Sequence, residues 1–150
     1  MTSNLLGDNK AMQIGLVVEN IDEAAQAWAH LLGVELPSII VTDTVEIAHT
    51  RYQGNPTPAQ AKLAFFDLGQ VSLELIQPIG EPSTWNDQLT AHGPSLHHIA
   101  FEIKGMETHV HELAKYGLQL VQQGDYTGGR YAYLDGQKRF GAVIELLEND

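Results

Sequence analysis

The chain has 150 residues, no cysteine, and 19 acidic against 8 basic side chains, for a formal net charge of −11. This length predicts one domain, residues 1–150, with a substantial core, and no apolar run approaches the roughly 20 residues of a membrane helix. The acidic balance argues against nucleic acid or an anionic membrane as partner and favours a small-molecule ligand. Disulfides and thiolate chemistry are excluded, and an amino terminus without a basic, apolar leader favours a cytoplasmic protein.

Regular structure begins with a strand followed by a helix. Residues 12–19 alternate between two faces, with Ile14, Leu16 and Val18 on one and Gln13, Gly15 and Val17 on the other. Residues 20–33 then show the apolar spacing of an amphipathic helix. Asp22 is a candidate cap for this helix, and Gly33 is its expected end.

Extended segments complete the first half of the chain. Two are expected around residues 38–52, and strands at 62–69 and 71–78 are joined by a tight turn into a hairpin. The segment 79–95 is rich in turn-forming residues and is expected to link this half to the next.

The second half repeats this order of elements. A strand, a helix and three further strands are predicted at 96–103, 105–117, 118–126, 130–135 and 141–148. Each half is therefore β-α-β-β-β, and the domain divides into module one (11–78), a linker (79–95) and module two (96–148). The expected fold class is α+β, with two βαβββ modules forming a curled mixed sheet around a cleft.

Polar side chains occupy matched positions in the two halves. The stretches AMQIGLVVE and SLHHIAFEI align without gaps so that Gln13 falls on His98, and the last strand of each half places Glu74 and Glu145 between apolar residues. By alternation all four face away from the helices, into the hollow of the sheet. Buried carboxylates need compensation, and a divalent metal ion with oxygen and nitrogen ligands supplies it. Such ligands favour zinc, nickel, cobalt or manganese. The cleft enclosed by the curled mixed sheet is therefore expected to be a metal cleft.

Other candidates have two interpretations that the sequence leaves open. Arg130 follows two glycines and is either a strand-edge charge or a clamp for a substrate carboxylate or phosphate. Lys138 and Arg139 are expected beside it at the mouth of the cleft. Tyr52 is either a wall of the substrate pocket or a packing residue. Alternation places His97 on the helix side of its strand, where packing is the simpler explanation.

The segments QIGLVVENIDEAAQAW, HHIAFEI and IELLE, with the paired modules, resemble the vicinal oxygen chelate superfamily. This superfamily includes glyoxalase I, methylmalonyl-CoA epimerase, extradiol dioxygenases and bleomycin-resistance proteins. The resemblance covers residues 11–148 and implies that the metal ligands are Gln13, Glu74, His98 and Glu145. It also implies a homodimer, with the modules pairing either within one chain or across the dimer.

The ligand set resembles one branch of glyoxalase I and implies a metal-dependent lyase or isomerase, similar to lactoylglutathione lyase. Such an enzyme abstracts a proton next to a carbonyl, with Glu145 as first candidate base and Glu74 as second. The substrate is expected to be an anionic thioester or hemithioacetal, with Arg130 and Tyr52 as candidate contacts. The compact length and the segment GPSLHHIAFEI resemble methylmalonyl-CoA epimerase instead, which is the alternative. A non-catalytic binding protein of the bleomycin-resistance type is the second alternative.

Overall fold

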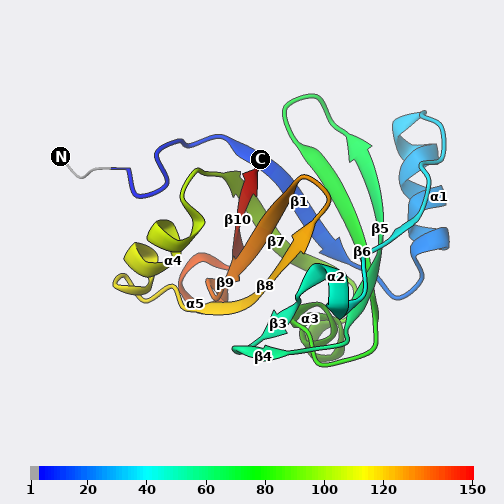
Figure 1. The fold of residues 1–150 in the computed structure, drawn as a ribbon. Helices are drawn as coiled ribbons and strands as arrows, with labels where there is room; N and C mark the ends of the chain where they lie inside the picture. The colour runs from blue at the N-terminus through cyan, green and yellow to red at the C-terminus, as the bar shows by residue number, and fades with distance from the viewer. Residues whose placement is uncertain (1–3) are drawn as a thin grey trace.

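The computed structural model describes residues 4–150, whose strands form one mixed sheet of ten (Figure 1). In chain order the elements are β1 (Ala11–Val17), α1 (Ile21–Leu32), β2 (Ile40–Val41), α2 (Val45–Ala48), β3 (Arg51–Tyr52), β4 (Asn55–Pro56), β5 (Gln60–Asp67), β6 (Ser72–Ile79), α3 (Thr84–His92), β7 (Ser95–Glu102), α4 (Met106–Ala114), β8 (Leu120–Tyr126), β9 (Gly129–Leu134), α5 (Gln137–Phe140) and β10 (Val143–Asn149). Across the sheet the strand order is β2-β5-β6-β1-β7-β10-β9-β8-β3-β4.

The two halves of the chain meet at the centre of the sheet, where β1 runs antiparallel to β7. On one side β1 pairs in parallel with β6, and on the other side β7 pairs in parallel with β10. The sheet twists and curls into a half-barrel, as Figure 1 shows. The predicted α+β fold with a curled mixed sheet is therefore confirmed.

Helix α1 covers the outer face of the first half. The side chain of Asn20 caps it by accepting a hydrogen bond from the backbone N–H of Glu23 at 3.2 Å. The predicted cap, Asp22, is wrong, because this residue lies inside the first turn. Gly33 ends the helix as expected, in the left-handed conformation that glycine adopts at low cost. The helix packs against the sheet in a hydrophobic cluster, whose buried residues are Val18, Ile21, Ala25, Ala29, Ala64, Phe66, Leu73 and Leu75.

Helix α4 covers the outer face of the second half in the same way. The buried residues of its cluster are Ile103, Leu113, Leu118, Ala132, Leu134 and Leu146. Helices α1 and α4 therefore lie outside the curl (Figure 1). Side chains alternate between the two faces of a strand, so the residues of β6, β1, β7 and β10 that do not pack under these helices point to the inner face.

The segment 79–95, expected to be a turn-rich connection, contains helix α3. The hydroxyl of Ser83 caps this helix by accepting a hydrogen bond from the backbone N–H of Asn86 at 3.0 Å. The helix inserts Trp85 into a cluster on the inner face, whose other buried members are Val17, Ala61, Ile76, Tyr133 and Val143. Helix α3 therefore packs inside the curl, at the lower end in Figure 1. The segment 38–52 also differs from expectation, because α2 separates its two short strands.

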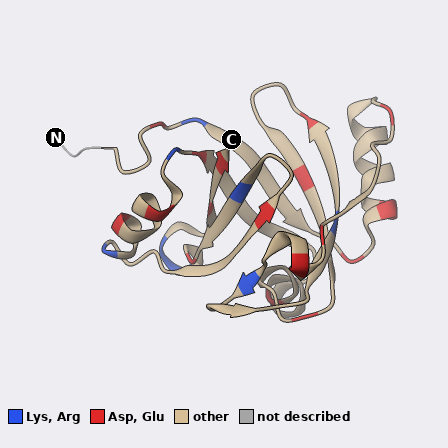
Figure 2. Cartoon of the chain, in the orientation of Figure 1, with Lys and Arg blue, Asp and Glu red and all other residues tan. Residues whose placement is uncertain are grey.

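Acidic side chains are distributed over both halves of the molecule, with few basic side chains between them (Figure 2). Among residues 4–150, no helix combines the length and the apolar character that crossing a membrane demands.

Candidate functional site

The structure brings the four predicted residues together within one chain. The Nε2 atom of His98 lies 2.9 Å from Gln13 Oε1, 3.3 Å from Glu74 Oε1 and 3.1 Å from Glu145 Oε1. These residues stand on four neighbouring strands at the centre of the sheet, in the order β6, β1, β7, β10. Strand alternation directs them to the inner face, while the adjacent apolar residues pack under α1 and α4.

The imidazole of His98 occupies a niche above Gly15, its cross-strand partner on β1. A Cβ atom added at Gly15 would lie 2.1 Å from His98 Cε1, much closer than van der Waals contact. The missing side chain of Gly15 therefore makes room for the ring. His98 is fully buried, and Glu74 and Glu145 are 7% and 3% exposed.

Gln13, Glu74, His98 and Glu145 form the four-residue cluster, and the charges of its ionisable members depend on one another. Burial alone would lower the pKa of His98, but Glu145 and Glu74 outweigh burial and raise it to about 10. Burial raises the pKa of Glu145, although the nearby imidazolium opposes this effect. The Oε1 atom of Glu145 is buried and makes no hydrogen bond of acceptable geometry, although His98 Nε2 is close. One carboxylate oxygen of the cluster is therefore left for a further partner.

The donor atoms, one imidazole nitrogen and the oxygens of an amide and two carboxylates, have the chemistry of a metal shell. Two ligand atoms bound to one zinc-sized ion at about 2.0–2.2 Å lie roughly 2.9–3.5 Å apart, and the three distances to His98 Nε2 fall in this range. In this structure, however, the oxygens face His98 Nε2 and not a common point between them. Accordingly, no three His, Asp or Glu side chains of residues 4–150 surround one point in metal-binding geometry. The donor types are those of a divalent-ion site and Glu145 Oε1 lacks a hydrogen bond, but a bound ion would require the His98 ring to move away from the three oxygens.

His97 does not point to the helix side, so that expectation is wrong. Gly15 pairs with His98 and the next residue, Leu16, pairs with Leu96, which leaves His97 as the extra residue of a β-bulge. The bulge turns both histidines to the inner face, and their Nδ1 atoms lie 2.8 Å apart. Burial and the neighbouring His98 charge keep the pKa of His97 well below its usual value. His97 is therefore the neutral partner of the pair.

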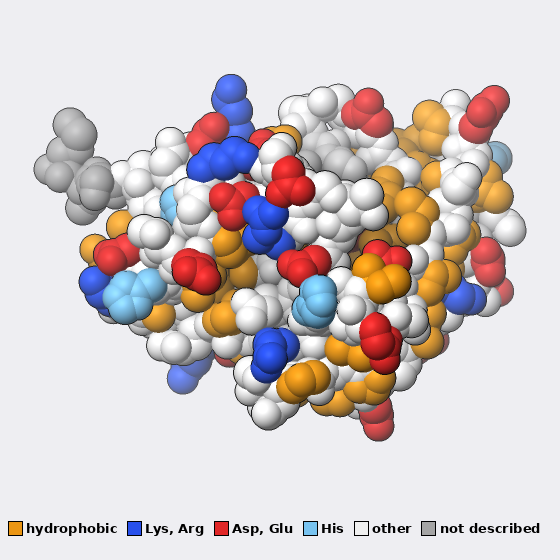
Figure 3. Space-filling model, viewed as in Figure 1, with side chains coloured by type: hydrophobic (Ala, Val, Ile, Leu, Met, Phe, Trp, Pro, Cys, Tyr) orange, Lys and Arg blue, Asp and Glu red, His pale blue; other side chains and the backbone are white. Residues whose placement is uncertain are grey.

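A cavity of about 520 Å³ opens beside the cluster and is lined by Gln13, Glu74 and Glu145. Aromatic side chains form much of its wall; these are Phe65, Trp85, Tyr126, Tyr131 and Tyr133. Within the described part of the chain, none of its lining residues is Lys, Arg or His, whereas four are Asp or Glu. Figure 3 shows apolar side chains gathered over α2 and β5, where Ile47 is 63% and Phe65 37% exposed. The cavity is therefore apolar in its walls and acidic in its polar groups.

Arg130 does not line this cavity. Its guanidinium pairs with Glu148 at 3.1 Å and with Asp150, and Glu148 in turn accepts hydrogen bonds from the first backbone N–H groups of α4. Arg130 therefore lies on the helix side of β9, opposite to its neighbour Tyr131. Lys138 and Arg139 belong to α5 and, like Arg130, are not among the residues that line this cavity.

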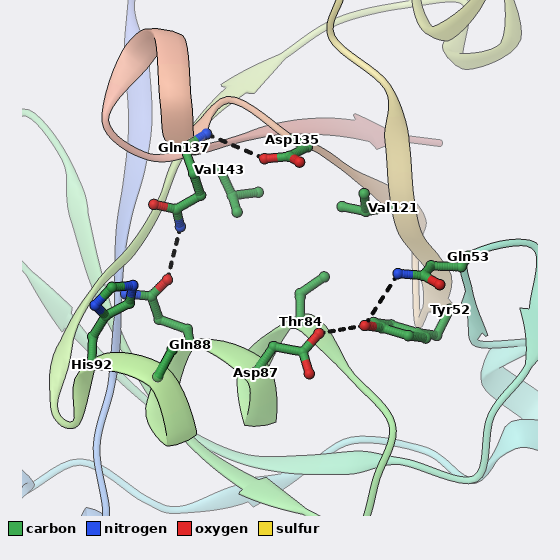
Figure 4. A pocket seen from close by; sticks show the side chains of 11 residues that line it. Tyr52, Gln53, Thr84, Asp87, Gln88, His92, Val121, Asp135, Gln137 and Val143 are labelled. Atoms are coloured by element: carbon green, nitrogen blue, oxygen red, sulfur yellow. Dashed lines mark hydrogen bonds between the residues drawn. The ribbon is translucent and has the colours of Figure 1, made fainter.

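Tyr52 lines a second, smaller cavity of about 260 Å³ (Figure 4). Its hydroxyl donates a hydrogen bond to Asp87 of α3, and Gln53 donates one to the same hydroxyl at 3.3 Å. Figure 4 shows Thr84 and Gln88 on the α3 side of this cavity and Gln137 and Asp135 opposite them. Tyr52 therefore does not contact the cavity beside the four-residue cluster.

The sequence left Trp85 and Tyr133 open as packing residues or pocket wall, and it did not single out the other residues that surround the cluster. Tyr133 packs 5.3 Å from the His98 ring, between ring centroids, and accepts a hydrogen bond from Trp85 Nε1 at 3.0 Å. Alternation in RYAYLD placed Tyr131 and Tyr133 on one face, which was an available signal. Thr84 Oγ1 lies 3.0 Å from His97 Nε2, and Gln122 accepts a hydrogen bond from the backbone N–H of Thr84. The sequence carries no signal for these two contacts, because they depend on where α3 docks.

Comparison with known proteins identifies the family. A family model described as the Glyoxalase/Bleomycin resistance protein/Dioxygenase superfamily matches residues 12–133. The chain belongs to this superfamily. One sequence relative of the chain is the uncharacterized protein YqjC of Bacillus subtilis (strain 168). It is 28% identical over 144 residues, which cover 93% of this chain and 92% of YqjC.

Solved structures of similar fold cover nearly the whole chain. The hypothetical protein BH1468 of Bacillus halodurans C-125 superposes with a TM-score of 0.66 at 23% identity, covering 94% of each chain. Methylmalonyl-CoA epimerase from Mycobacterium tuberculosis superposes with a TM-score of 0.61 at 19% identity, covering 100% of this chain and 93% of that one. The predicted membership of the vicinal oxygen chelate superfamily is confirmed.

Proposed function

We propose that the protein is a metal-dependent lyase or isomerase of the glyoxalase I type, which removes a proton from a carbon next to a carbonyl group. The observation that carries this proposal is the convergence of Gln13, Glu74 and Glu145 on His98 Nε2 within 3.3 Å. These four residues would hold a zinc, nickel, cobalt or manganese ion, which would supply a Lewis acid for the negative charge that develops on the carbonyl oxygen.

Glu145 is the first candidate for the base. Its carboxylate lines the cavity, its Oε1 atom lacks a hydrogen bond, and burial raises its pKa toward the range in which proton transfer is efficient. Glu74 stands on the opposite side of His98 and also lines the cavity. Two carboxylates on either side of one bound carbon allow a proton to be removed by one group and returned by the other.

The cavity lining limits which part of the substrate enters. No basic side chain among its lining residues would pair with an anion, and Glu74 and Glu145 repel one. The aromatic wall instead accepts an apolar or uncharged group. We therefore place the reacting carbonyl end inside the cavity, and the charged carrier, such as glutathione or coenzyme A, outside it.

A methylmalonyl-CoA epimerase-like racemase is the second candidate. Solved structures of methylmalonyl-CoA epimerases match nearly the full length of this chain, so they and this chain share one compact form of the fold. The chemistry at the carbon is the same in both candidates, and only the carrier and the position to which the proton returns differ.

The test supplies both substrates in deuterated water to protein loaded with zinc, nickel or cobalt. Deuterium-labelled or isomerised product from the hemithioacetal of methylglyoxal and glutathione supports the lyase, and deuterium at the α-carbon of methylmalonyl-CoA supports the epimerase. His98→Ala is expected to lose most bound metal and all activity. The matched control His30→Ala, on the exposed side of α1, should retain both. Stoichiometric metal in His98→Ala would contradict the ligand assignment. No reaction of the metal-loaded wild-type protein with either substrate would contradict both candidate functions and point to another carbonyl substrate, whereas absence of bound metal in the wild-type protein would favour a non-catalytic binding protein.

A further inference from the structure

We infer that His97 and Thr84, the first residue of α3, form an outer support that holds the His98 ring with Nε2 facing the two glutamates. The inference rests on the proposed function for its purpose, because the support matters most if His98 binds a metal ion. It assigns a positioning role to the segment 79–95, which connects the two halves of the chain. It also accounts for the second histidine of the HH pair.

The support is a continuous chain of hydrogen bonds. His98 Nδ1 lies 2.8 Å from His97 Nδ1, and His97 Nε2 lies 3.0 Å from Thr84 Oγ1. Both rings are fully buried, so water does not substitute for these partners. Each imidazole therefore has both of its ring nitrogens engaged by protein atoms.

The direction of the chain follows from the needs of a metal ligand. A histidine that binds through Nε2 keeps its proton on Nδ1, and a second-shell acceptor at Nδ1 stabilises that tautomer. His98 Nδ1–H then donates to His97 Nδ1, which leaves the His97 proton on Nε2, where it donates to Thr84 Oγ1. One tautomer of His97 satisfies both contacts, and the other would place two N–H groups against each other.

Thr84 is itself held in place by buried neighbours. Its backbone N–H donates to Gln122 Oε1 at 2.8 Å, and Gln122 Nε2 donates to the Tyr131 hydroxyl at 3.1 Å. The following residue, Trp85, donates to the hydroxyl of Tyr133, whose ring packs against both histidines. The docking of α3 inside the curl thus fixes the ring that carries the candidate metal ligand.

The experiment compares isosteric variants at the two support positions. Thr84→Val removes the hydroxyl and keeps the shape, whereas Thr84→Ser keeps the hydroxyl. His97→Leu removes the acceptor, whereas His97→Asn keeps an acceptor oxygen near the position of Nδ1. Thr50→Val is the matched control, because Thr50 is a buried threonine that forms no hydrogen bond with either histidine ring.

Two readouts separate a positioning role from a general loss of stability. Zinc affinity, measured by competition with a chromophoric chelator, is expected to fall about 10- to 100-fold in Thr84→Val and His97→Leu. It should stay near the wild-type value in Thr84→Ser and Thr50→Val, with partial rescue in His97→Asn. Long-range ¹H–¹⁵N NMR of the protein without added metal should show His97 as the neutral Nε2–H tautomer.

The outcomes test the support by His97 and Thr84 separately from the proposed function. An Nδ1–H tautomer of His97, or equal zinc affinity in Thr84→Val and Thr84→Ser, overturns the support even if the wild-type protein binds zinc tightly. Failure of the wild-type protein to bind any metal ion overturns the proposed function. In that case the tautomer measured by NMR still decides whether His97 and Thr84 hold the ring.

Discussion

Metal binding at the candidate centre should displace a proton from His98, which couples affinity to pH. The pKa of about 10 means that the imidazole is protonated at neutral pH, and its charge is compensated by Glu74 and Glu145. A metal ion needs the Nε2 lone pair, so it competes with this proton. Below pH 10 the apparent affinity should therefore rise about tenfold per pH unit, and at pH 7 it should be about a thousandfold below its limit.

The assay is isothermal titration calorimetry of zinc binding at pH 8 in two buffers of different ionisation enthalpy. The difference in heat gives the number of protons released, expected to be about one per metal ion bound. Glu145→Gln removes the largest contribution that raises the pKa, so this variant should release markedly fewer protons. Glu102→Gln, an exposed glutamate on β7, is the matched control.

The same linkage predicts the stability of the protein without added metal. A folded-state pKa raised above the unfolded value of about 6.5 stabilises the fold fully below pH 6.5. This stabilisation is lost as the pH rises toward 10. Thermal denaturation from pH 6 to 10 should therefore show a falling midpoint, with a smaller change in His98→Ala. Zinc affinity that is independent of pH from 7 to 9, with no proton release, would refute the premise that His98 is protonated at neutral pH. The predicted pH dependence of zinc affinity and the predicted fall of the thermal midpoint both depend on this premise.

Two further predictions test the niche of His98 and the surface charge. Gly15→Ala should place a methyl group 2.1 Å from His98 Cε1, which should lower the free energy of unfolding by about 1–3 kcal/mol and weaken zinc binding. In a His98→Ala background, chemical denaturation should show almost no such loss of stability. An equal loss in that background would rule out the clash with His98 as the cause. Arg130→Ala should leave the Michaelis constant of the active substrate unchanged at low and high salt, because Arg130 pairs with Glu148 and Asp150 outside the cavity. If steady-state kinetics of this variant showed a salt-dependent rise in the Michaelis constant, Arg130 would again be a candidate anion clamp.

The sequence by itself determined which strand residues face the inside of the curl. Alternation along a strand is a local property, so the apolar partners of the helices in LELI and VIELL already assign Glu74 and Glu145 to the opposite face. The match of Gln13 with His98 in the two halves added the same information for the central pair. The structure places all four side chains on that face and within reach of one atom. Their role as metal ligands stays a prediction.

Tertiary structure alone decided the surroundings of this cluster. The bulge at His97 arises from its pairing with β1, so no period counted along β7 could reveal it. Arg130 is neutralised by two carboxylates near the chain end that strand pairing brings beside it. Helix α3 lies in a segment whose composition favours turns, and it is held by contacts of Thr84 and Trp85 with residues distant in sequence. Local patterns determine which face a side chain occupies, whereas its partners there depend on how distant segments pack.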